Sequence, residues 1–194
     1  MTRPRSGDKR NAILAAATNI IAEQGLSAPT AKIARAAGVA DGSLFTYFPD
    51  KDDLLNQLYL ELKADMRKRM TSSSPKSRNP PRSLKQQARH VWNSYIDWGI
   101  SFPARRKAMA QLTVSDRITE KSRQAGTEGF DDAASTMQQI AARGGLRDRP
   151  SAFASSIMVS LAETTMDFIS RYPREADRYR DAGFEAFWNA VSKK

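Results

Sequence analysis

The chain has 194 residues, of which 40% are hydrophobic, enough to form a core in one domain or in a small domain joined to a larger one. It has no cysteine and one histidine, which excludes disulfides, thiolate metal ligands and thiol nucleophiles. No apolar run approaches the roughly 18 residues that a membrane span needs, and the N-terminus lacks a signal-peptide core. We therefore expect a cytoplasmic protein.

The net charge of +10 indicates an anionic partner, with nucleic acid ahead of a membrane surface. The charge is spread along the chain. Residues 1–70 hold 11 basic and 8 acidic residues, residues 71–82 hold 3 basic residues and no acidic ones, and residues 83–194 hold 17 basic and 13 acidic residues. Charge alone therefore does not locate a binding surface.

Helical periodicity begins at Lys9 and continues to Gln24, where Ile13, Ala17 and Ile21 lie on one side of a predicted helix. Gly25 follows where that helix should end. A second apolar stripe begins after Lys51, with Asp50 as the predicted N-cap. No segment shows sustained β alternation, so we predict an all-α fold of about nine helices.

Two short helices must fit between Gly25 and Lys51. Thr30 can cap the first, which ends at Gly38, and the second begins near Asp41. Two short helices joined by a glycine-containing turn have the helix-turn-helix form. With Leu44 and Phe48 facing the core, the outer surface of the second helix consists of small and hydroxyl side chains between two aromatic ones: Gly42, Ser43, Phe45, Thr46 and Tyr47.

Such a surface suits the major groove of DNA. Small residues allow a close approach, hydroxyls can bond to base edges or phosphates, and an aromatic ring can pack on a thymine methyl group. Lys51 would lie beside the phosphate backbone. Asp41 either caps its helix or accepts a hydrogen bond from cytosine N4.

This segment resembles the tetracycline-repressor (TetR) family. The resemblance rests on Thr30, Ile33-Ala34, Ala37-Gly38-Val39, Gly42-Ser43-Leu44-Phe45, Tyr47-Phe48 and Lys51 followed by Leu54, and it covers about residues 9–66. It implies that residues 41–48 form the recognition helix. The residues expected to touch DNA are Thr30, Lys32, Asp41, Gly42, Ser43, Phe45, Thr46, Tyr47 and Lys51.

The predicted domains are a basic arm over residues 1–8, a DNA-binding domain over 9–68 with its helix-turn-helix at about 30–48, a Pro/Ser-rich loop over 69–82, and a helical effector-binding and dimerisation domain over 83–194. The cations Arg3, Arg5, Lys9 and Arg10 fit a minor-groove arm and a solvated tail equally well. Further helices are expected over residues 83–101, 103–115, 119–143, 151–171 and 174–192.

Large and flexible side chains in the second domain suggest an effector pocket, with core packing as the alternative for any one of them. The candidates are Trp92, Tyr95, Trp98, Met109, Leu112, Phe130, Met137, Met158, Glu163 and Met166. The predicted helix over residues 151–171 is apolar on more than one side, and the final helix offers small residues for close packing, which together predict a homodimer. Its expected interface residues are Phe153, Ile157, Leu161, Phe168, Tyr179, Ala182, Gly183, Ala186 and Phe187.

These observations predict a transcriptional regulator, a repressor released from a near-palindromic operator in double-stranded DNA by an unknown small molecule. The alternative is a ligand-binding or scaffold protein whose helix-turn-helix does not recognise DNA. An enzyme is not expected, because the single histidine, His90, has no nucleophile pattern near it and glycine-rich phosphate loops are missing. No cofactor and no metal are expected.

Overall fold

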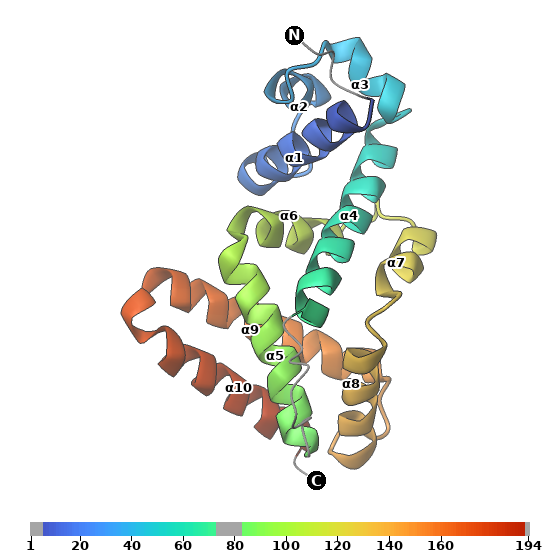
Figure 1. The fold of residues 1–194 in the computed structure, drawn as a ribbon. Coiled ribbons are helices and arrows are strands. Elements are labelled where there is room, and N and C mark those ends of the chain that lie inside the picture. The colour runs from blue at the N-terminus through green and yellow to red at the C-terminus, as the bar shows by residue number, and fades with distance from the viewer. Residues whose placement is uncertain (1–5, 73–82, 193–194) are drawn as a thin grey trace. The chain divides into compact units, whose positions relative to one another are not determined.

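The computed structural model describes residues 6–72 and 83–192, and within these ranges every regular element is a helix (Figure 1). The all-α prediction is confirmed. The elements are α1 (Ser6–Gln24), α2 (Thr30–Ala36), α3 (Asp41–Tyr47), α4 (Lys51–Ser72), α5 (Leu84–Ser101), α6 (Pro103–Thr113), α7 (Glu120–Thr127), α8 (Asp131–Arg143), α9 (Ser151–Arg171), a 3-10 turn (Pro173–Glu175) and α10 (Ala176–Ser192).

The chain divides into two compact units, residues 1–65 with 102–127 and residues 66–101 with 128–194. Helix α4 contributes to both. Helices α6 and α7 belong to the N-terminal unit, whereas the sequence places them in the second domain. The reason is packing: α6 lies against α1, with Met109 and Leu112 buried, and the side-chain amide of Gln111 donates a hydrogen bond to the Ile21 carbonyl at 2.9 Å.

The core of the N-terminal unit follows the predicted apolar stripes. Ile13, Ala17 and Ile21 of α1 are at most 1% exposed, as are Leu54 and Leu58 of α4. The backbone amide of Asp53 donates to Asp50 Oδ1 at 2.7 Å, which confirms the predicted cap of α4.

The C-terminal unit is built around Trp92 of α5, which is fully buried. Its ring stacks on Phe187 of α10 with 6.1 Å between centroids, and its indole N–H donates to the Arg180 carbonyl at 3.2 Å. Helices α9 and α10 pack against each other as a hairpin (Figure 1). The single helix predicted over residues 119–143 is wrong, because the chain breaks at Gly129, which has φ +74°.

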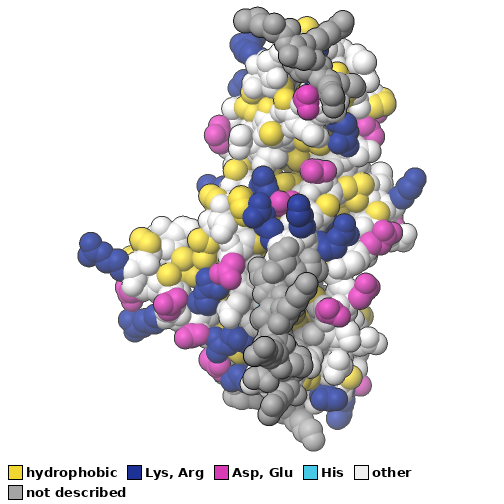
Figure 2. Space-filling view, viewed as in Figure 1, with side chains coloured by type: hydrophobic (Ala, Val, Ile, Leu, Met, Phe, Trp, Pro, Cys, Tyr) yellow, Lys and Arg dark blue, Asp and Glu magenta, His cyan; other side chains and the backbone are white. Residues whose placement is uncertain are grey.

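Charged side chains cover both units. On the face in Figure 2, Lys and Arg side chains occur among Asp and Glu side chains in each unit. Among the described helices, none is both long enough and apolar enough to cross a membrane.

Candidate nucleic-acid interface

Helices α2 and α3 form the predicted helix-turn-helix pair. Gly38 ends α2 with φ +68°, a conformation that strains any residue with a side chain. Two backbone hydrogen bonds close the turn: Gly38 N–H donates to the Arg35 carbonyl at 3.1 Å, and Val39 N–H donates to the Ala34 carbonyl at 3.0 Å. The turn thereby fixes the direction in which α3 leaves α2.

The two sides of α3 differ sharply in burial. Leu44 and Phe48 are fully buried and hold the helix against the N-terminal unit. On the outer side, Phe45 is 48% exposed and Thr46 is exposed as well. Gly42 is also exposed, with no heavy atom within 4 Å of the place that a Cβ would occupy, while Ser43 and Tyr47 are partly exposed. The predicted outer surface is therefore open to a partner.

Neither short helix has the cap that the sequence suggests. The N-cap of α2 is Pro29 and that of α3 is Ala40, and neither makes a side-chain cap hydrogen bond. Thr30 and Asp41 are instead the first helical residues. The capping role considered for Asp41 is therefore wrong, and its side chain is exposed.

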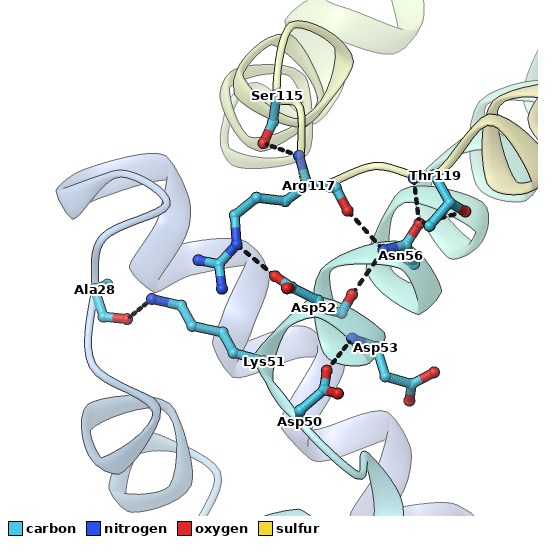
Figure 3. Close-up of polar contacts among 9 residues, drawn as sticks. All are labelled: Ala28, Asp50, Lys51, Asp52, Asp53, Asn56, Ser115, Arg117 and Thr119. Atoms are coloured by element: carbon cyan, nitrogen blue, oxygen red, sulfur yellow. Dashed lines mark hydrogen bonds and ion pairs between the residues drawn. The ribbon is translucent and has the colours of Figure 1, made fainter.

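Lys51, at the start of α4, is partly buried and hydrogen-bonded within the protein (Figure 3). Its ammonium group donates to the carbonyl oxygen of Ala28, in the turn between α1 and α2, at 2.7 Å. Burial lowers the pKa of Lys51 below its usual value, the nearby Arg117 lowers this pKa further, and Asp52 opposes the shift. Lys51 thus links the first turn of α4 to the segment that leads into α2.

The chain between α6 and α7 is bonded to the same turn of α4 (Figure 3). The Arg117 guanidinium pairs with the Asp52 carboxylate. The side-chain amide of Asn56 donates to the Arg117 carbonyl at 2.9 Å and accepts from the Thr119 backbone amide at 2.9 Å. These contacts hold residues 117–119 against α4 inside the N-terminal unit.

Two cations lie one turn apart on the exposed side of α2. The Lys32 ammonium donates to the side-chain oxygen of Gln24 at 2.9 Å. Arg35 is exposed, and its side chain makes no polar contact with any described residue. Arg35 was not among the residues expected to touch DNA, although basic residues at i and i+3 on a short helix beside α3 are a pattern that suits phosphate contacts.

Arg10, one of the cations considered for an N-terminal arm, packs against Phe48 at the end of α3. Arg3 and Arg5 lie outside the described residues. The Arg10 guanidinium lies 5.6 Å from the centre of the Phe48 ring and donates to the side-chain oxygen of Gln57 at 3.0 Å. Arg10 therefore braces the buried side of α3.

Comparison with known proteins matches this geometry. Residues 13–58 fit the sequence profile of bacterial regulatory proteins of the tetR family. Over 59 residues, 30% of this chain and 30% of the relative, the chain is 42% identical to the fatty acid metabolism regulator protein of Bacillus subtilis (strain 168). The fold matches a TetR-family transcription regulator from Shewanella sp. PV-4, with 29% identity and TM-score 0.80 over 96% of this chain and 99% of that one. The segment of residues 13–58 belongs to the TetR family.

A further structure shares the fold alone. It is the transcriptional regulator FadR from Bacillus subtilis in complex with stearoyl-CoA, with 19% identity and TM-score 0.64 over 95% of this chain and 98% of that one. TetR-family members are transcription regulators and not enzymes, so the exposed side of α3 belongs to a DNA-binding domain.

The C-terminal unit contains a cavity of about 350 Å³, within the range of small-molecule sites. The α7–α8 turn closes one side of it, where Arg67 donates to the Glu128 carbonyl at 2.6 Å. The rest is lined by side chains from α4, α5, α8 and the residue before α8: Arg67, Met70, His90, Val91, Ser94, Phe130, Asp131, Asp132 and Ala133.

Of the pocket residues predicted from the sequence, Phe130 alone lines this cavity. Met109 and Leu112 are buried in the N-terminal unit instead. Tyr95 donates its hydroxyl to the Glu163 carboxylate at 2.7 Å, so these two residues form a polar contact between α5 and α9. The remaining predicted residues are core side chains of the C-terminal unit, at most 7% exposed: Trp92, Trp98, Met137, Met158 and Met166.

The residues predicted to form a dimer interface also divide into two groups. Phe187 is fully buried on Trp92, and a Cβ on Gly183 would lie 2.1 Å from Thr165 Oγ1. Both positions pack inside their own unit, although Gly183 is partly exposed. The others are exposed or partly exposed: Phe153, Ile157, Leu161, Phe168, Tyr179, Ala182 and Ala186.

Proposed function

We propose that this TetR-family transcription regulator represses transcription as a homodimer on a near-palindromic operator, and that a small molecule in the C-terminal cavity releases it. The observation that carries the proposal is the outer side of α3, where Thr46 and Phe45 are exposed beside an unobstructed Gly42. Nothing in the core of the unit uses these side chains, and their small, hydroxyl and aromatic character suits base edges in a major groove.

The dimer proposal is supported by an apolar stripe along α9. Phe153, Ile157, Leu161 and Phe168 follow helical spacing and remain exposed or partly exposed, and Phe153 is 50% exposed. A second copy would bury this stripe around a two-fold axis. Such symmetry suits recognition helices about 34–36 Å apart on an inverted repeat.

The effector proposal is supported by the cavity between α4, α5 and α8. FadR from Bacillus subtilis, which shares the fold, holds stearoyl-CoA in its structure, so a ligand within such a fold has a precedent. The ligand can release DNA only by binding the DNA-free conformation more tightly than the DNA-bound one.

Selection from a random double-stranded DNA library tests the proposal directly. The native chain should enrich an inverted repeat, and Thr46→Ala and Tyr47→Ala should each weaken binding to it. Thr113→Ala on α6 is the matched control, because its hydroxyl bonds only within its own helix, to the Met109 carbonyl. Recovery of no repeat would favour the ligand-binding or scaffold alternative.

Dimerisation and ligand response need separate measurements. Sedimentation of the native chain as a monomer at micromolar concentration would refute the two-fold assembly, and Phe153→Glu should weaken the dimer. Stearoyl-CoA is the first effector probe, followed by a chemically varied panel scored by melting shift and by release of the selected DNA. A panel in which ligands raise the melting temperature yet never release DNA would refute ligand-controlled repression.

A further inference from the structure

The carboxylate of Asp41 makes no polar contact within the described part of the chain. Asp41 is the first residue of α3 and is exposed, but it does not cap that helix. Its side chain makes no hydrogen bond or ion pair with any described residue. Unlike Asp50, which holds the Asp53 amide, and Asp52, which pairs with Arg117, this carboxylate can be replaced without loss of an internal contact.

Asp41 lies in a stretch of sequence without basic residues. No Lys or Arg occurs from residue 36 to residue 50, so α3 carries one charge and that charge is negative. Asp41 also lies one helical turn before Phe45, and the two side chains share an edge of the helix. Without a lysine or arginine, α3 cannot make the commonest base contact, a bidentate bond to guanine.

A carboxylate on a DNA-facing helix is selective because an ionised Asp can only accept hydrogen bonds. Phosphates repel it, and so do the O6 and N7 atoms of guanine and the O4 atom of thymine. Adenine offers the N6 donor, but its N7 acceptor lies beside that donor. Cytosine N4 is the one major-groove donor that is the base's only polar group there.

We infer that Asp41 is a specificity-determining residue, and that it selects a cytosine in each half-site through a hydrogen bond from cytosine N4 to its carboxylate. This inference rests on the proposed function, because it requires that α3 enter the major groove. It identifies the base at one position of the operator, and it explains a negative charge on a recognition helix in a chain of net charge +10.

The test is library selection with the native chain, Asp41→Asn and Asp41→Ala. The native chain should enrich cytosine at one position of each half-site. The Asn variant should change that position to adenine, because Asn can bond to adenine N6 and N7, and the Ala variant should lose the preference. Replacing the cytosine should weaken native binding by about 5- to 150-fold and should affect the Ala variant little.

Glu61→Gln controls for the loss of one negative charge. Glu61 is exposed on α4 in the same unit and lies outside α3, so this variant should enrich the native sequence. Circular dichroism should show native helix content for all variants, because Asp41 makes no internal contact. If both Asp41 variants enrich the native bases, the inference is overturned and the proposed function stands. If the native chain enriches no inverted repeat, the proposed function itself fails.

Discussion

Lys51→Met distinguishes a lysine that positions the helix-turn-helix from one that neutralises a phosphate. Methionine keeps most of the aliphatic stem but removes the donor of the 2.7 Å hydrogen bond to the carbonyl of Ala28, a residue that is 4% exposed. Hydrogen bonds that involve a charged group contribute about 1.5–3 kcal/mol. Since Lys51 is only partly buried, we expect the free energy of unfolding to fall by about 1–2 kcal/mol, near the lower end of that range.

Urea unfolding followed by circular dichroism measures that loss, and fluorescence polarisation at several salt concentrations measures the phosphate contribution. Lys51→Met should lower DNA affinity but leave the salt slope unchanged. Lys32→Met is the matched control: Lys32 is exposed on α2, so its loss should change stability by under about 0.5 kcal/mol and make the slope shallower by about 0.9. Unchanged stability together with a loss of about 0.9 in slope for Lys51→Met would refute the positioning role.

Three further substitutions test the packing and the charges. Gly42→Ala should raise the free energy of unfolding by about 0.5–1 kcal/mol, because alanine favours the helix and its Cβ would meet no atom within 4 Å. The same substitution should weaken binding to the selected operator. Undiminished binding would show that the backbone at Gly42 does not approach DNA closely. Gly183→Ala should lower the free energy of unfolding by about 1–3 kcal/mol, because the new Cβ would lie 2.1 Å from Thr165 Oγ1 and 2.9 Å from Trp92. An unchanged melting temperature would contradict this packing. Burial lowers the pKa of Lys63 in the folded protein below its usual value of 10.5. At pH values between these two pKa values, the unfolded chain binds more protons than the folded one. The free energy of unfolding therefore rises with pH in that range. Lys63→Met should flatten this rise in urea titrations from about pH 8 to 9, below the pKa of 10.0 at which Tyr59 of the unfolded chain loses its proton. Equal slopes for the two proteins would count against this reasoning.

The helix-turn-helix was predictable because its signals are local. The apolar pairs Ile33-Ala34 and Leu44 with Phe48 are fully buried as expected, and Gly38 takes the positive φ that ends α2. Periodicity and glycine placement operate over a few residues, so they can be read without the rest of the fold.

Contacts between distant segments were not predictable in the same way. The sequence placed Lys51 near DNA, and nothing local indicated that its ammonium group reaches Ala28, 23 residues earlier. It likewise indicated that α10 has an apolar side, but not that Phe187 packs on Trp92 of its own unit. Helical periodicity identifies a buried side without identifying what buries it, whether the same subunit or a second one.

Three features of α3 weaken the helix, and all of them lie on its exposed side. A seven-residue helix gains little from propensity alone and depends on packing, which Leu44 and Phe48 supply from the buried side. On the exposed side, the first turn lacks a side-chain cap, Gly42 replaces a better helix former, and Phe45 leaves 48% of its surface in water. Natural sequences tolerate such departures mainly at functional sites. Because these features weaken the free protein and occur together within a TetR-family DNA-binding domain, we propose that contact with DNA is the need that retains them.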